Sequence, residues 1–410
     1  MIAAYRGGRS ALSLCQQWGV SGTWLYSKFA EWGVETRTQA RVRQMKQTDA
    51  LGVRRAVDLP NIPEATAPGA GDDAVLEWRV RRAAGAAWPG TAVGIGPRIS
   101  LRVRRVVAEE GVLFAKTGTE TGREAACLRW MARQEIRAAR LVHHSPPTGV
   151  LFTGAVPGPS LGSYLLAAPA RTADLLRAAL AEAGLLGRAD EPLPVSITHA
   201  DVPAGLRSAF LARMPAWRRL AVVGRIGPVR RRLLTCLIDA AAPLAGTEEL
   251  GPERHLHHGQ LTPSHVRGVL DAPVLLSPLL RYAPDDDDLV QLVAHVLLLA
   301  ARHRDGNVRD RIVTGVEEVA MDRARQVGRC SRDAGHLWVD GLVTRCLMEV
   351  AIHTTIGLTT REPSVRDDAE FIRQTTRIVE FISRTVRAHR TSGPARAWEA
   401  ILAQTREAHL

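Results

Sequence analysis

The sequence predicts an α+β protein of two lobes, a small β-rich N-lobe and a large helical C-lobe, preceded by a short helical segment. Strand-like runs gather between residues 92 and 116, and after Ser160 the apolar residues recur mostly at helical spacing. Strands that precede helices in this way are typical of α+β architecture. No apolar run in the 410-residue chain reaches the ~18 residues that a membrane-spanning helix needs, so no membrane partner is expected.

The chain is strongly basic, with 54 Lys and Arg against 42 Asp and Glu and a formal net charge of +12. A positive excess is typical of proteins that bind nucleic acid or another polyanion. Only Lys28, Lys46 and Lys116 are lysines, however, and an arginine- and alanine-rich composition also indicates a GC-rich genome. Both interpretations stay open. Where a lysine is retained, arginine is expected to be a poor substitute.

The cysteines and histidines give no metal or disulfide framework. The five cysteines are scattered and form no Cys-x-x-Cys pair, which argues against a disulfide scaffold or a cysteine-based zinc site. His255, His257, His258 and His265 lie close in sequence, but no cysteine is nearby and we expect no metal there. Residues 1–10 lack the apolar stretch of a secretory signal, so we expect a cytoplasmic protein.

Residues 1–45 form the first predicted unit, a helix-turn-helix-like segment. Ser10 can cap a helix that runs to about Trp18, a Gly-Val-Ser turn follows, and a second helix would end at Gly33. This pattern resembles the DNA-binding segment of resolvase-like regulators, in which the second helix enters the major groove. Its aromatic side chains suit a protein or peptide partner equally well, and packing on the main domain is a third alternative. The candidate contact residues are Thr23, Trp24, Ser27, Lys28, Arg37 and Arg41.

A linker is expected over residues 46–88, because this stretch is rich in Pro, Gly and Ala. The N-lobe then occupies residues 89–158. Its first strand-like runs are followed by a helix at Thr121–Arg133, by a loop that contains the pair His143-His144, and by an extended segment at Gly149–Val156. The strand-like runs are Ala92–Ile95, Ile99–Val107 and Val112–Lys116.

Lys116 and Glu124 are a candidate nucleotide-binding pair within this lobe. Lys116 ends a strand-like run, and Glu124 follows eight residues later on the predicted helix. In kinases, a strand lysine held by a helix glutamate binds the phosphates of ATP. The alternative is a surface ion pair of little energetic value. Upstream, Gly94 and Gly96 would let the backbone approach phosphates, although glycine is common in any turn.

A third piece lies at residues 255–266 and reads HLHHGQLTPSHV. In order and spacing, the three pieces resemble the aminoglycoside phosphotransferase-like, or choline-kinase-like, family, whose catalytic signature is His-Gly-Asp-Leu-His-Pro-x-Asn-Val. The resemblance covers residues 90 to about 300 and implies a two-lobed protein-kinase-like fold with a cleft for ATP or GTP. Residues 152–158 resemble the family's hinge, and Asp288-Leu289 resembles the Asp-Leu-Ala that follows its metal-binding strand.

This chain departs from the family signature at three positions. Gln260, two residues after His258, stands where the family has its catalytic Asp, and an amide cannot act as a general base. His265 replaces the Asn that holds magnesium. The family's second metal ligand falls at Ser277 or Pro278, and neither chelates magnesium as a carboxylate does. The resemblance therefore implies a pseudokinase without ordinary phosphoryl transfer and argues against magnesium as a cofactor.

The C-lobe is expected to span residues 159–410 and to be helical apart from a short strand-like run at Pro273–Leu276. The run Asp285–Asp288 could supply a substitute metal ligand, but a solvated loop that leads into a helix N-terminus is the better interpretation. Arginine recurs throughout this lobe, so a cationic aminoglycoside is not expected as the ligand. The predicted helices are Leu289–Arg302, Val308–Gln326, Leu337–Ile356, Asp367–His389 and Ala397–Ala408.

Three functions are consistent with these patterns. The one that we favour is a pseudokinase that acts by binding, as a regulator or scaffold in an actinobacterial biosynthetic or peptide-modification pathway, and this setting is an analogy at the level of fold. The second is an active ATP-dependent phosphotransferase with rearranged catalytic residues. The third is a helix-turn-helix DNA-binding regulator whose kinase-like domain senses a small molecule.

Overall fold

The computed structural model divides the chain into two units, residues 1–71 and 72–410. The helix-turn-helix-like segment lies outside the described residues, apart from Lys28 and Glu31, which are helical and form an ion pair with 2.5 Å between Lys28 Nζ and Glu31 Oε2. The described residues are 28, 31, 71–91, 93–100, 102–109, 111–194, 197, 205–223, 226–246, 254–268, 272–329, 331–360 and 367–407.

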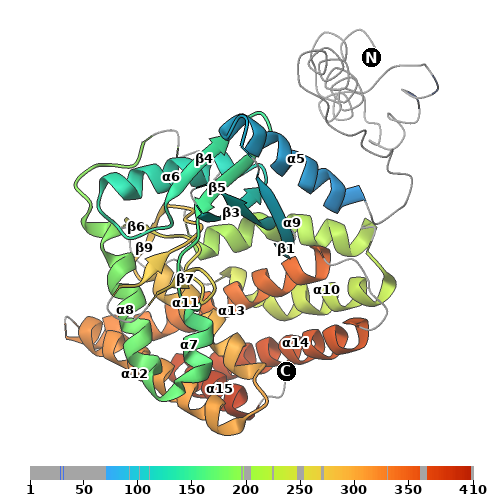
Figure 1. Ribbon diagram of the computed structural model, residues 1–410. Helices are drawn as coiled ribbons and strands as arrows, with labels where there is room; N and C mark the ends of the chain where they lie inside the picture. Colours follow the sequence, from blue (N-terminus) through green and yellow to red (C-terminus); the bar gives the residue numbers. More distant parts are fainter. Residues whose placement is uncertain are drawn as a thin grey trace. The chain divides into compact units, whose positions relative to one another are not determined.

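The second unit contains a five-stranded antiparallel sheet with the strand order β1-β2-β3-β5-β4 (Figure 1). Buried residues alternate with half-buried ones along β3, as expected for a strand with one face on a core. Because helices follow this sheet, the predicted α+β class is confirmed. The strands are β1 (Gly94–Ser100), β2 (Val103–Ala108), β3 (Gly111–Thr117), β4 (Leu141–Ser145) and β5 (Val150–Gly154).

Helix α5 (Gly71–Ala87) packs on this sheet, although it falls within the segment expected to be a linker. Val80 of the helix shares a buried cluster with Val106 and Phe152 of the sheet. The Trp88 ring, just past the helix, meets the Phe152 ring edge-on with 5.1 Å between the ring centroids. The small residues and arginines of α5 give little amphipathic contrast, which is why its apolar face is hard to recognise in the sequence.

Helix α6 (Thr121–Arg133) has the predicted bounds and packs against β4 and β5. His143 and His144, expected in a loop, lie instead in β4, one of the two edge strands of the sheet. Both side chains are half-buried and polar, so the local sequence lacks the apolar alternation of a strand. Pairing with β5, which no local pattern reports, decides the conformation here.

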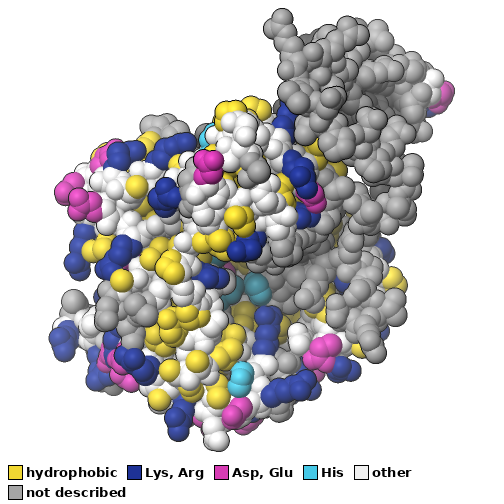
Figure 2. Space-filling view, in the orientation of Figure 1, with side chains coloured by type: hydrophobic (Ala, Val, Ile, Leu, Met, Phe, Trp, Pro, Cys, Tyr) yellow, Lys and Arg dark blue, Asp and Glu magenta, His cyan; other side chains and the backbone are white. Residues whose placement is uncertain are grey.

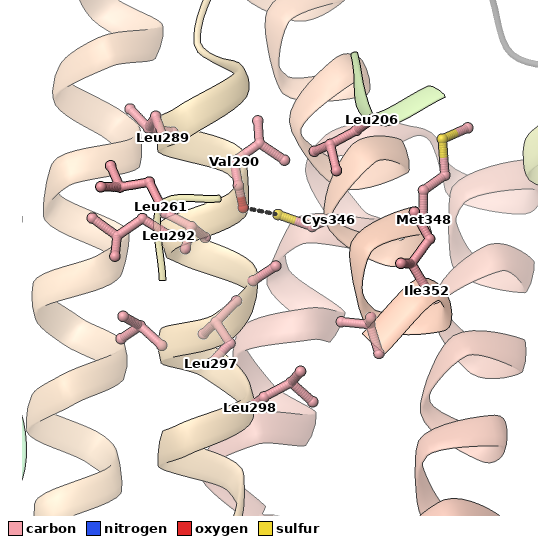
Figure 3. Packing of buried hydrophobic residues seen from close by; sticks show 14 of the residues in the cluster. Leu206, Leu261, Leu289, Val290, Leu292, Leu297, Leu298, Cys346, Met348 and Ile352 are labelled. Atoms are coloured by element: carbon pink, nitrogen blue, oxygen red, sulfur yellow. Dashed lines mark hydrogen bonds between the residues drawn. The ribbon is translucent and has the colours of Figure 1, made fainter. Parts of the chain in front are cut away.

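The helical lobe contains each of the five predicted helices, with bounds shifted by a few residues. Helix α11 is buried on nearly all sides and lies beside α13, where the Cys346 thiol donates a hydrogen bond to the Val290 carbonyl at 3.8 Å (Figure 3). The helices are α7 (Leu161–Ala167), α8 (Thr172–Gly184), α9 (Leu206–Val223), α10 (Pro228–Ala241), α11 (Asp287–Ala301), α12 (Gly306–Gly328), α13 (Arg332–Thr360), α14 (Asp367–Ser392) and α15 (Pro394–Glu407).

Two short β-ribbons lie between α10 and α11 in the chain, one made of β6 and β9 and the other of β7 and β8. Residues 258–265 form the loop from β6 to β7, and β8 lies within the strand-like run predicted at Pro273–Leu276. Among the described residues, no helix is both long and apolar enough to cross a membrane. The strands are β6 (Arg254–His257), β7 (Val266–Arg267), β8 (Val274–Leu275) and β9 (Arg281–Pro284).

Candidate ligand-binding cleft

The structure brings Lys116 and Glu124 together. Lys116 lies on β3, opposite Leu151 of β5, and Glu124 lies in the first turn of α6. Lys116 Nζ is 2.5 Å from Glu124 Oε2, and the Glu124 side chain is only 3% exposed. A carboxylate this deeply buried needs a cation and hydrogen bonds to compensate for its lost hydration. Lys116 keeps 28% of its side-chain surface exposed, so a ligand can still reach it.

Helix α11 fixes the backbone of the loop that follows β6. Asp288 accepts hydrogen bonds from the backbone N–H groups of His258 (2.7 Å) and Gly259 (3.0 Å). One turn further along the helix, Gln291 Oε1 accepts a hydrogen bond from the Leu261 N–H (3.1 Å), and Gln291 Nε2 donates one to the Gly259 carbonyl (3.3 Å). Both side chains are buried, so these bonds satisfy groups that would otherwise lack partners.

Gly259 is required by the close approach of two backbone segments. Its φ is +77°, and a Cβ atom at this position would lie 2.3 Å from the Leu279 carbonyl oxygen. The Leu279 N–H donates a hydrogen bond to the His258 carbonyl at 3.0 Å, which holds the two segments side by side. Any side chain at position 259 would force them apart.

The acidic run at residues 285–288 is engaged within the fold. Asp285 is exposed ahead of α11, and Asp287 and Asp288 begin the helix as expected, but these two are buried, which corrects the expectation of solvation for them. Asp287 accepts hydrogen bonds from Arg281 Nη2 (2.7 Å) and from the Leu206 N–H (3.3 Å). Within the described residues, no group of three or more His, Cys, Asp or Glu side chains is placed to hold a metal ion.

Three histidines of this segment have shifted pKa values. Burial lowers the pKa of His258, and burial also lowers the pKa of His265 to about 4, so both rings are neutral at pH 7. His265 Nδ1 is 2.7 Å from the Gln260 carbonyl oxygen and therefore carries the ring proton. His257 differs: burial opposes its protonation, but the hydrogen bond and negative charge of Asp288 outweigh burial and raise its pKa.

Gly94 is not brought to Lys116. Gly94 and Gly96 both lie in β1, and Gly94 pairs with Val107 of β2, whereas Lys116 pairs with Val103 at the other end of β2. These two positions of β2 are four residues apart, which corresponds to about 13 Å along a strand. Gly94 is thus a paired strand residue, whereas Gly96 lies where the pairing of β1 and β2 shifts, beside the backbone of Arg105.

A cleft of about 1090 Å³ opens beside the loop and is walled by α6, α9, α11 and α13. Gln260 and His265 both line this cleft, whereas Ser277 and Pro278 do not. Ser277 is half-buried with a φ of +51°, and Pro278 is buried. On one face of the molecule, histidine side chains lie in a hollow with Lys or Arg side chains beside it (Figure 2).

Three arginines that the sequence did not single out line the cleft: Arg123 of α6, Arg213 of α9 and Arg281 of β9. Its carboxylates are Glu120, which is exposed, and Glu349, whose Oε1 is 2.9 Å from a histidine ring nitrogen of α11. No motif marks the arginines, because they come from elements far apart in the chain. Only the folded chain assembles this charged lining.

A second cavity, of about 370 Å³, lies among α11, α13, α14 and α15. Leu297, Leu347 and Ile378 contribute to its largely apolar wall, and none of the predicted site residues lines it. The cavity is therefore separate from the features that the sequence singled out.

No protein-family model and no curated protein matches this chain. Among solved structures, it is similar to a choline/ethanolamine kinase family protein from Mesorhizobium loti, at 14% identity, with 80% of this chain and 98% of that chain covered and a TM-score of 0.45. A choline kinase from Cryptosporidium parvum Iowa II is 10% identical, with 79% and 99% covered and a TM-score of 0.48. The GDP complex of wild-type aminoglycoside 2′-phosphotransferase-IIIa is 14% identical, with 75% and 98% covered and a TM-score of 0.45. These similarities assign no role to any residue of this chain.

Proposed function

We propose that this chain is a pseudokinase, a kinase-like protein that binds ATP or GTP through Lys116 and does not transfer its phosphate. The observation that carries this proposal is the contrast between an intact ion pair and a loop that has an amide in place of a catalytic carboxylate. Lys116 and Glu124 meet at 2.5 Å, as the strand lysine and helix glutamate of a kinase must in order to hold nucleotide phosphates. The loop beside the cleft presents Gln260, an amide, where a kinase needs a carboxylate.

The hydrogen bonds of Asp288 support the same proposal. Its two carboxylate oxygens accept the His258 and Gly259 N–H groups. Turning Asp288 toward a metal ion would leave both N–H groups without partners, at a cost of about 1–3 kcal/mol each. Asp288 therefore maintains the shape of the loop instead of supplying a metal ligand.

The proposal includes a role as regulator or scaffold in an actinobacterial biosynthetic or peptide-modification pathway, with residues 1–45 in contact with DNA or a protein. That segment lies outside the described residues, so this part of the proposal rests on the sequence pattern. Deletion of residues 1–45 is expected to abolish retention on a DNA duplex, measured over a series of salt concentrations. Unchanged retention would rule out these residues as the DNA contact.

The test of nucleotide binding is the thermal unfolding of the full-length protein with ATP or GTP, each with and without magnesium. A ligand at about 100 times its dissociation constant adds about 2.7 kcal/mol to the free energy of unfolding. We expect a rise in Tm without magnesium that is lost in Lys116→Ala. Arg396→Ala, which removes an ion pair with Glu399 on the surface of α15, is the control and should keep the full rise.

Two results would contradict this proposal. A stabilisation that requires magnesium, together with release of phosphate from the nucleotide, would favour an active phosphotransferase with rearranged catalytic residues. The absence of any rise in Tm with either nucleotide would exclude nucleotide binding through Lys116.

A further inference from the structure

Three arginines from distant parts of the chain meet in the cleft. Arg123 lies in the first turn of α6, Arg213 lies on α9, and Arg281 begins β9. Burial lowers the pKa of Arg123 and of Arg213, and the charge of Arg281 adds to this effect, while the charges of Glu120 and Glu349 oppose it. The positive charge of Arg281 thus acts on each of the other two arginines of the cleft, and an anion bound there would offset this repulsion.

Among the described residues, only one of these arginines has a carboxylate partner. Arg281 Nη2 donates a hydrogen bond to Asp287 at 2.7 Å. Arg123 Nη2 donates one to the backbone carbonyl of Leu280 at 2.7 Å, which carries no charge. Arg213 makes no hydrogen bond or ion pair with a described residue. Among the described residues, therefore, no carboxylate is in contact with Arg123, which is half-buried, or with Arg213, which is exposed at the cleft.

The other groups of the cleft do not supply that anion. Glu120 is exposed, and Glu349, whose charge raises the pKa of Arg213, makes its hydrogen bond to His295. Among the described residues that line the cleft, no Phe, Tyr or Trp ring is present to receive an ammonium group. This lining disfavours a cationic ligand such as choline or an aminoglycoside.

We propose that this part of the cleft binds the phosphate group of a small molecule, with the guanidinium groups of Arg123 and Arg213 as its donors. Two arginines complement a phosphate monoester, whose charge at neutral pH is about −1.5 to −2. The planar guanidinium group also donates two parallel hydrogen bonds to phosphate oxygens. The inference rests on the proposed function, since it adds a ligand in the cleft to a nucleotide at Lys116, which does not itself line this cleft.

The experiment compares inorganic phosphate with sodium chloride at equal ionic strength in thermal unfolding and calorimetric titration of the full-length protein. Phosphate is expected to raise the Tm of the wild type, and Arg213→Ala should weaken phosphate binding by about tenfold or more. This substitution removes no hydrogen bond to a described residue, so the variant should fold normally. Arg219→Ala changes an exposed arginine on the same helix and should bind phosphate as the wild type does.

Lys116→Ala separates this inference from the proposed function. Stabilisation by phosphate should survive in Lys116→Ala and be lost in Arg213→Ala, whereas stabilisation by nucleotide should show the opposite pattern. Equal effects of phosphate on the wild type and Arg213→Ala, or no effect beyond that of chloride, would overturn the inference and leave nucleotide binding untouched. If the rise in Tm with phosphate were lost in Lys116→Ala but kept in Arg213→Ala, phosphate would bind at the nucleotide site, and the inference would be overturned as well.

Discussion

Asp288, in the first turn of α11, accepts a hydrogen bond from the backbone N–H of His258 at 2.7 Å. Burial alone would raise the pKa of this carboxyl group, but the hydrogen bond and charge of His257 and the N–H of His258 outweigh burial and lower it. The charged carboxylate is therefore the form that the fold stabilises. Through it, the core of the helical lobe determines the shape of the loop that carries Gln260.

Asp288→Asn should lower the free energy of unfolding by about 2–4 kcal/mol, because an amide would turn a donor toward one of the buried N–H groups. Asp285→Asn is the matched control. The Asp285 side chain is 56% exposed beside His255, so removal of its negative charge should lower the free energy of unfolding by less than about 1 kcal/mol. Urea denaturation of both variants measures the difference. Equal losses would mean that Asp288 does not support the loop.

Gly259→Ala should destabilise the protein by about 1–3 kcal/mol or more. The new methyl group would clash with the Leu279 carbonyl oxygen, and alanine rarely adopts the φ of +77° that residue 259 has. Gly85→Ala is the control, since nothing lies within 4 Å of a Cβ atom at that position of α5. There the substitution should add up to about 1 kcal/mol of stability. In chemical denaturation, the midpoint of Gly259→Ala should therefore fall and that of Gly85→Ala should rise. A midpoint for Gly259→Ala that does not fall would contradict this account of Gly259.

His353 makes stability depend on pH. Burial, with the charges of His295 and Arg302, lowers its pKa from 6.5 to about 4. Between these two pH values the unfolded chain binds a proton that the folded chain excludes, so the free energy of unfolding falls as the pH falls through this window. Each unit of pKa shift corresponds to about 1.4 kcal/mol.

His353→Gln removes this titration. Between about pH 7 and pH 4.5, the free energy of unfolding should therefore fall by about 1–3 kcal/mol less in the variant than in the wild type. Urea denaturation at several pH values gives both curves. Other histidines titrate in both proteins, so the difference between the curves isolates His353. Parallel curves would show that its pKa is the same in the folded and unfolded chains.

The described cysteines should differ in reactivity. Burial raises the pKa of Cys127 to about 11 and that of Cys346 to about 12, whereas Cys236 is exposed on α10. Because the thiolate is the reactive form, iodoacetamide should label Cys236 in the native protein and the two buried thiols only after denaturation. Peptide mass mapping distinguishes the sites. Prompt labelling of Cys346 would indicate that α11 and α13 separate readily.

Local patterns predicted much of this fold. The apolar spacing of residues 287–407 is enough to predict α11 to α15, and α6 has the predicted bounds, because helical periodicity is a property of neighbouring residues. The position of Lys116 on a strand and of Glu124 on a helix follows from the same kind of pattern. By contrast, β4 depends on its pairing with β5, and the residues of β4 do not encode that pairing by themselves.

The order of amino acids alone also predicts that Gln260 and His265 stand where a kinase has its catalytic and metal-binding groups. Burial and charge environment required the tertiary structure, because they depend on residues that are distant in the chain. Arg123 reaches the Leu280 carbonyl across 157 positions, and Arg213 joins it in the cleft from a third element. Long-range packing likewise buried Asp287 and Asp288, which no local property of an acidic run predicts.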